Sequence, residues 1–175
     1  MKDVIFGLDG KINIDNFKIT INDLANNIGN LSNRIFTILE KKYRLAVPQI
    51  QDSYSVNEDL LIDSRKFYNF IKNFEIHNYT KAIHSYSTLI NKYVNDNEPW
   101  NSKINSEQNI NHILFSTLLA LKNIFILLFP ITPNKSIRFL KSIGIDEAKI
   151  NLNILNKPLE SGIKLNNPGI LFKKY

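Results

Sequence analysis

The sequence contains no cysteine among its 175 residues, and it has a single tryptophan. The absence of cysteine excludes disulfide bonds, thiolate nucleophiles and zinc sites built on sulfur. It is compatible with a cytoplasmic protein but does not require one. Glycine-rich stretches that could cradle a phosphate are also missing, so the sequence predicts no phosphate-binding loop.

Long uninterrupted apolar runs are scarce. The most apolar stretch extends from Ile113 to Ile131, but Lys122 lies in its middle and Pro130 interrupts it near its end. We therefore expect a buried helix of a bundle and no membrane span. The N-terminus carries Asp3 early and reaches Gly7 before any long apolar run, so no signal peptide is predicted.

Positive charge exceeds negative charge, with a net charge of +6 and a pI near 9.4. This balance favours a polyanionic partner, although many soluble proteins are mildly basic. The abundant asparagines are spread evenly, which indicates AT-rich coding bias and not chemistry. The basic residues that are candidates for phosphate contacts, with an ordinary solvated basic face as the alternative, are Lys41, Lys42, Arg44, Lys135, Arg138 and Lys141.

Apolar residues recur every three or four positions along most of the chain, and no strand alternation is strong. The sequence therefore predicts an all-α fold, a bundle of about five helices. We expect residues 1–175 to form a single domain, with an opening segment (1–14), a helical bundle (15–143) and an irregular C-terminal tail (144–175) draped over the bundle. The predicted helices span about 15–43, 55–73, 77–96, 106–129 and 132–143.

The first predicted helix carries an apolar stripe from Phe17 to Ile38 and a polar ridge of Thr20, Asp23, Asn27, Asn30 and Arg34. Asn30 and Arg34 stand four residues apart, so their side chains are neighbours on a helix. An amide beside a planar guanidinium suits the recognition of base edges, and an ordinary solvated face is the alternative.

Three further features are read from local sequence. Gly29, in the middle of this helix, predicts close packing of another element. The spacing of Ser55 and Glu58 fits a capping box that begins the second helix. That helix is expected to bury Leu60, Phe67, Ile71 and Phe74.

The single tryptophan, Trp100, follows Pro99 at the end of the third predicted helix. Proline cannot continue a helix, and we expect Glu98 before it to be extended. An aromatic ring at a helix end can stack on a splayed base, as in proteins that read single-stranded RNA. A core position for the ring is the alternative.

The histidines do not predict a metal site. His77 and His84 are seven residues apart, about 10.5 Å along a helix, which is too far to share one ion. His112 stands alone. No catalytic residue and no metal ligand is predicted.

Two distant segments resemble methionyl-tRNA synthetases. Leu24–Arg34 resembles their first-helix motif, Leu-Ala-Asn-x-x-Gly-Asn-Leu followed by arginine, and Tyr93–Trp100 resembles their Tyr-to-Pro-Trp segment. Phe6–Gly10 resembles the connection from the catalytic part, and Leu127–Pro133 resembles an apolar helix that ends in a proline turn. The segments occur in family order, so the chain resembles the C-terminal helical anticodon-binding domain.

This resemblance implies that Asn30, Arg34 and Trp100 face the CAU anticodon of tRNA(Met), with Trp100 stacked on a base and with Asn27 and Pro99 in support. It implies a cytoplasmic ligase that joins methionine to its tRNA with ATP. The class I catalytic signatures are absent from this chain, so the resemblance implies a fragment that selects the tRNA and is inactive alone. ATP, with zinc as a further candidate, would belong to the N-terminal catalytic domain, which the resemblance implies as a partner beside tRNA(Met).

The chain departs from the family pattern at two places. Leu171 and Phe172 continue as Lys173-Lys174-Tyr175 where the family often has a Leu-Phe-Pro-Arg-like tail. Asn101-Ser102-Lys103 follows Trp100 where an apolar residue, Ala and Lys are common. Two alternatives remain open: the anticodon-binding domain of another class I synthetase, and a helical protein–protein adaptor.

Overall fold

The computed structural model describes residues 13–50 and 56–174, and within these residues it contains helices and no strand. The first helix, α1 (Ile14–Leu24), continues through a π-helical turn, η1 (Ala25–Gly29), into α2 (Asn30–Tyr43), so that the three form one rod. The other helices are α3 (Ser64–Lys72), α4 (Ile76–Asn97), α5 (Glu107–Leu128) and α6 (Pro133–Ser142). The prediction of an all-α bundle with about five helical rods is confirmed.

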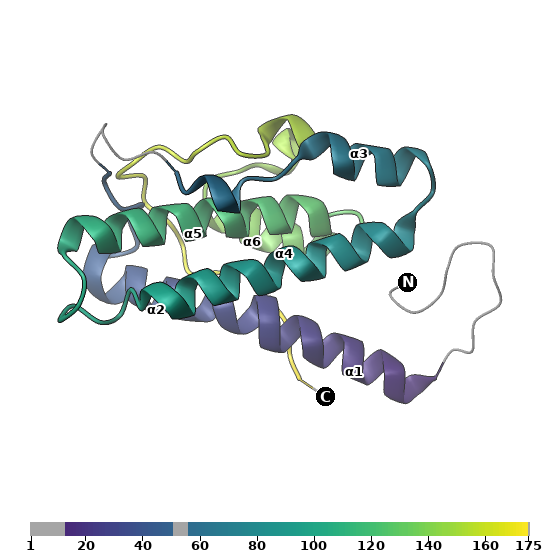
Figure 1. Ribbon diagram of the computed structural model, residues 1–175, viewed down its shortest axis with the longest axis horizontal. Coiled ribbons are helices and arrows are strands. Elements are labelled where there is room, and N and C mark those ends of the chain that lie inside the picture. Colours follow the sequence, from purple (N-terminus) through teal and green to yellow (C-terminus); the bar gives the residue numbers. More distant parts are fainter. Residues whose placement is uncertain (1–12, 51–55, 175) are drawn as a thin grey trace.

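Helix α5 forms the centre of the bundle. It packs against α2, α4 and α6, while α3 packs on α4 (Figure 1). Every side chain from Ile113 to Leu128 is buried. Within the described ranges, α5 is the helix long and apolar enough to cross a membrane, but 89% of its apolar window is buried in the bundle. This burial is typical of the core helix of a globular domain.

Local sequence explains where these helices begin. The Ser106 hydroxyl accepts a hydrogen bond from the Asn109 N–H (3.2 Å) and caps α5. Pro133 occupies the first turn of α6, where proline's fixed φ suits a helix start and its missing N–H is not needed. Thr132 does not cap that helix with its side chain, because its hydroxyl instead donates to the Leu128 carbonyl of the preceding helix (3.4 Å).

The second predicted helix begins later than the sequence indicates. The Asp63 carboxylate accepts from the Arg65 and Lys66 N–H groups (3.0 and 3.4 Å), so α3 begins at Ser64. Residues 58–60 form a separate 3₁₀ turn, and Ser55 of the predicted capping box lies outside the described residues.

The burial predicted for this helix is half correct. Leu60 and Phe67 are buried, but Ile71 (41% exposed) and Phe74 (65% exposed) are not. Phe74 has a left-handed backbone (φ 58°), which ends the helical period and turns its ring away from the core.

The apolar stripe of the first rod is buried only in its second half. Ile28, Leu31 and Ile35 are buried, as predicted. Phe17 is 64% exposed, because α1 extends away from the other helices (Figure 1). The opening segment, including Phe6–Gly10, lies mostly outside the described residues.

The tail after α6 is irregular apart from two 3₁₀ turns, Glu147–Lys149 and Leu152–Ile154. It lies along the bundle, and Lys164 forms an isolated antiparallel bridge with Ala46. The Nζ of Lys122, buried in α5, donates to the Ile154 and Lys157 carbonyls. These bonds fix the tail to the core helix.

A series of phenylalanines joins the end of the tail to the bundle. Phe172 stacks on Phe125 (ring centroids 6.4 Å apart), and Phe125 stacks on Phe139 of α6 (4.0 Å). Phe139 meets Phe36 of α2 edge to face (5.8 Å). Such pairs add to the stabilisation that apolar burial provides.

Candidate nucleic-acid interface

Trp100 lies in the turn that follows α4, next to a residue with an unusual backbone. Glu98 has φ 40° and ψ 62°, the left-handed region, so the prediction of an extended Glu98 is wrong. The extended conformation that we expected and the left-handed one that is observed both avoid the right-handed helical region, which is disfavoured for a residue before proline. The left-handed one lets the Glu98 N–H bond to the Val94 carbonyl (3.1 Å) and its carbonyl accept from the Asn101 N–H (2.8 Å).

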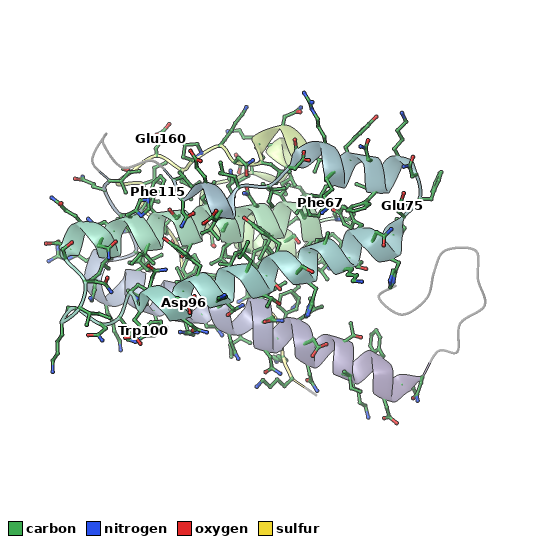
Figure 2. All side chains as sticks on the ribbon, in the orientation of Figure 1. Phe67, Glu75, Asp96, Trp100, Phe115 and Glu160 are labelled. Carbon is green, nitrogen blue, oxygen red and sulfur yellow. The ribbon has the colours of Figure 1, made fainter. Side chains whose placement is uncertain are left out.

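The ring of Trp100 is a surface feature. Its residue is 43% exposed, whereas Pro99 before it is buried. Figure 2 shows Trp100 in the turn beyond the C-terminal end of α4. The proline therefore fixes the turn against the bundle, and the tryptophan is not a core residue.

Arg34 of α2 lies over this ring. The Cζ of its guanidinium is 4.7 Å from the Trp100 ring centroid, a cation–π contact. The same guanidinium donates through Nη2 to the Asn95 Oδ1 (3.1 Å). A cation–π contact contributes about 0.5–1 kcal/mol at exposed sites. Two segments far apart in the sequence thus meet at Trp100.

The predicted pair of Asn30 and Arg34 is adjacent in space, since both residues belong to α2. Asn30 is exposed and Arg34 is half-buried. The supporting residue Asn27 is engaged within the fold, because its carbonyl accepts from the Asn91 Nδ2 of α4 (3.2 Å). The Asn27 side-chain oxygen lies 3.5 Å from the same nitrogen.

The π turn breaks the polar ridge predicted from spacing. The Asn30 N–H donates to the Ala25 carbonyl, five residues back, as well as to the Asn27 carbonyl. One extra residue in a turn rotates everything before it by about 100° relative to everything after it. Thr20 and Asp23 therefore do not continue the line of Asn30 and Arg34.

Gly29, the last residue of the π turn, packs against the tail as predicted. A Cβ built on Gly29 would lie 3.6 Å from the Phe172 Cδ2, an ordinary van der Waals distance. The π turn is therefore enclosed by α4 on one side, through Asn91, and by the tail on another, through Phe172.

Two residues of the site were not found from the sequence, namely Asn91 and Asn95. They stand one turn apart on α4, eight and four residues before Pro99. Their four-residue spacing, on the helix that leads to Trp100, is a signal that could have identified them. In a chain so rich in asparagine, that signal was not distinctive.

The basic residues that the sequence offered for phosphate contacts lie on the surface. Each of the six predicted phosphate-contact residues is exposed, namely Lys41, Lys42, Arg44, Lys135, Arg138 and Lys141. Among residues 13–50 and 56–174, no three His, Asp or Glu side chains lie close enough to hold a metal ion. The arrangement places an exposed ring, a planar guanidinium and an amide side by side.

Known proteins similar to this chain are methionine–tRNA ligases. The ligase of Nanoarchaeum equitans is 33% identical over 91% of this chain. The ligase of Rickettsia prowazekii is 29% identical over 100% of this chain. The crystal structure of free methionyl-tRNA synthetase from Mycobacterium tuberculosis superposes with a TM-score of 0.90 over 99% of the chain, at 23% identity. No protein-family model matches the chain.

The chain spans only a part of these relatives, 20% of the Nanoarchaeum ligase and 36% of the Rickettsia one. It covers 37% of the Mycobacterium tuberculosis structure. The sequence matches extend across the helical bundle and include both segments that meet at Trp100. From this similarity in sequence and fold, the chain belongs to the methionyl-tRNA synthetase family, of whose members it represents one part.

Proposed function

We propose that this chain recognises the CAU anticodon of methionine tRNAs, as the anticodon-binding part of a methionine–tRNA ligase. The observation that carries the proposal is the contact between Arg34 and Trp100, 4.7 Å from guanidinium carbon to ring centroid. It brings together the two segments that resemble the family's anticodon-reading motifs, and Asn30 stands one helical turn away.

Each of the three side chains has a separate role in this proposal. The Trp100 ring, 43% exposed, stacks on one anticodon base. Arg34 presents donors in a fixed plane to a base edge, and Asn30 offers a donor and an acceptor together. Pro99, which is buried, and Asn27, which is hydrogen-bonded to Asn91, support these side chains. The exposed basic residues contact phosphates.

The full ligase supplies what this chain lacks. In the proposed protein an N-terminal catalytic domain is the partner within the same polypeptide, and it binds ATP and methionine in the cytoplasm. Any zinc also belongs to that domain. The present chain holds no class I catalytic signature, so it selects the tRNA and is inactive in methionine activation by itself.

The test is a titration with RNA hairpins that differ only in the anticodon. The chain is expected to bind the CAU hairpin more tightly than hairpins with other anticodons, with affinity that falls as salt is raised. Equal affinity for all anticodons would contradict the proposal. Preference for a different anticodon would indicate another class I synthetase, and no RNA binding at all would favour an adaptor.

A further inference from the structure

The π turn at Ala25–Gly29 lies inside the segment that resembles the first-helix motif, and the Asn91 side chain of α4 hydrogen-bonds to it. A π turn is an irregularity that needs support, because its hydrogen bonds run to residues five positions back and not four. Such turns occur often at functional sites. Asn91 of α4 and Phe172 of the tail pack against this turn.

The Asn91 amide donates in two directions. Its Nδ2 lies 2.9 Å from the Ser87 carbonyl, one turn earlier on α4, and 3.2 Å from the Asn27 carbonyl in the π turn. The first bond orients the amide along its own helix, and the second joins that helix to η1. The side chain is half-buried, so the bond across the two helices is partly shielded from water.

One turn beyond Asn91, Asn95 accepts from Arg34 (3.1 Å). The two asparagines lie on the same face of α4, since they are four residues apart. The same face of α4 therefore bonds to the first rod at two points. Asn91 bonds to Asn27, three residues before Asn30, and Asn95 bonds to Arg34, four residues after it.

From these contacts we propose that Asn91 is a positioning residue for anticodon recognition. It fixes the π turn against α4, and through that turn it sets the place of α2 so that Arg34 lies over Trp100 and Asn30 stays exposed beside them. Asn91 itself touches no RNA. The role in recognition rests on the proposed function, whereas the geometric role can be measured without RNA.

The experiment uses the only tryptophan of the chain as its probe. The indole N–H of Trp100 gives one resonance in a ¹⁵N–¹H correlation spectrum, and its position depends on the guanidinium above the ring. Asn91→Asp keeps the shape of the side chain but replaces the donor with a charged acceptor facing two carbonyls. We expect a shifted indole resonance and about a tenfold loss of preference for the CAU hairpin over other hairpins.

Asn91→Gln is the rescuing variant, because its amide can still donate to the Asn27 carbonyl. It should restore the indole resonance and most of the preference, including in the event that Asn91→Asp does not fold. Asn78→Ala is the matched control, since Asn78 is an exposed asparagine of the same helix whose amide donates to the nearby Glu75 carboxylate (2.7 Å). It should leave both readouts unchanged.

The proposal is overturned if a folded Asn91→Asp protein keeps the parent's indole resonance, or if Asn91→Gln folds and shifts the resonance as far as Asn91→Asp does. If the parent chain shows no anticodon preference, the proposed function fails, but the indole resonance still decides the positioning role. If the resonance shifts and the preference persists, Asn91 positions Arg34 without influencing recognition, and the inference is wrong.

Discussion

Two polar clusters of this protein use the same residue types in opposite ways. The tail cluster (Lys122, Asn123 and Asn156) is enclosed: Asn123 and Asn156 exchange bonds of 3.0 and 3.1 Å, and Asn156 also bonds both ways with the backbone of Ile62 (2.7 and 3.0 Å). The Trp100 cluster (Asn30, Arg34, Asn95 and Trp100) keeps Asn30 and much of the ring exposed.

The difference shows how burial separates structural from ligand-binding polar groups. In the tail cluster the donors and acceptors satisfy each other, so removing one leaves a buried partner unsatisfied. In the Trp100 cluster only part of the bonding capacity is used, so removing a side chain costs little stability and affects what binds outside. Five predictions test this contrast, from the largest effect to the smallest.

Lys122→Met should cause the largest loss of stability. The change keeps the length of the side chain but removes the donor to the Ile154 and Lys157 carbonyls. We expect the free energy of unfolding to fall by about 2–4 kcal/mol. Thermal melting followed by circular dichroism measures it. Lys157→Met is the control, because Lys122 bonds to the backbone carbonyl of Lys157 and not to its exposed side chain. A Lys122→Met protein with the melting temperature of its parent would contradict the structural role of the tail cluster.

Trp100→Ala should act on binding and hardly on stability. Base–aromatic stacking contributes about 1–3 kcal/mol per base, so affinity for the CAU hairpin should fall roughly 5- to 150-fold. Trp100→Phe keeps a smaller ring and should retain part of the affinity. Melting and hairpin titration on the same variants check this. A much lower melting temperature for Trp100→Ala would make the ring structural, and unchanged affinity would remove the stacking role.

Alkaline pH should stabilise the tail cluster. Burial, assisted by the charge of Lys157, lowers the pKa of Lys122 from 10.5 to about 8. Between these values the unfolded chain binds more protons, so the free energy of unfolding rises with pH. We expect a gain of about 1–2 kcal/mol from pH 8 to 10, measured by urea titration.

Above pH 10 the gain in stability should reverse. Burial raises the pKa of Tyr79 from 10.0 to about 12, so unfolding becomes easier again above pH 10, where the unfolded tyrosine ionises first. Lys122→Met should lose the rise between pH 8 and 10 and keep the later decline. If Lys122→Met shows the same rise as the parent, the buried lysine is not its source.

Arg34→Lys should weaken discrimination more than binding. Lysine keeps the positive charge but loses the planar fork that lies over Trp100 and donates to Asn95. We expect the preference for CAU over other anticodons to fall about tenfold, with little change in affinity for the other hairpins. Lys42→Gln, at an exposed position about two helical turns after Arg34, is the reverse control and should lower all affinities together. An unchanged preference would exclude edge reading by Arg34.

Gly29→Ala should have the smallest effect. An added Cβ meets Phe172 at an ordinary distance of 3.6 Å, and alanine costs less backbone entropy than glycine in a helical conformation. We expect stability to change by no more than about 1 kcal/mol, towards stabilisation, in thermal melting. A marked loss would mean that the π turn needs the freedom of glycine itself.

The sequence was sufficient to predict the bundle, because the periodic burial of Ile28, Leu31 and Ile35 on α2 follows from apolar spacing alone. It was also sufficient to select Arg34 and Trp100, which the fold brings into contact. Neither spacing nor composition can place two segments side by side, so their selection came from the family resemblance.

Other features depend on contacts that a one-dimensional pattern does not contain. The π turn keeps the apolar spacing of an ordinary helix in sequence, and the residues that pack against it, Asn91 and Phe172, are far away along the chain. The exposure of Phe17 and Phe74 depends on where α1 leaves the bundle and where α3 turns. The capping of α3 was missed because Asp63 competes with an equally plausible site upstream.

The phenylalanine series has a consequence for folding during synthesis. Phe172 contacts both the π turn near the start of the described chain and Phe125 in the core helix. A ribosome therefore releases α1 to α6 before the residue that closes the aromatic series can arrive. Until Phe172 arrives, the nascent bundle leaves the apolar surface that this ring covers exposed, and exposed apolar surface of this kind promotes aggregation.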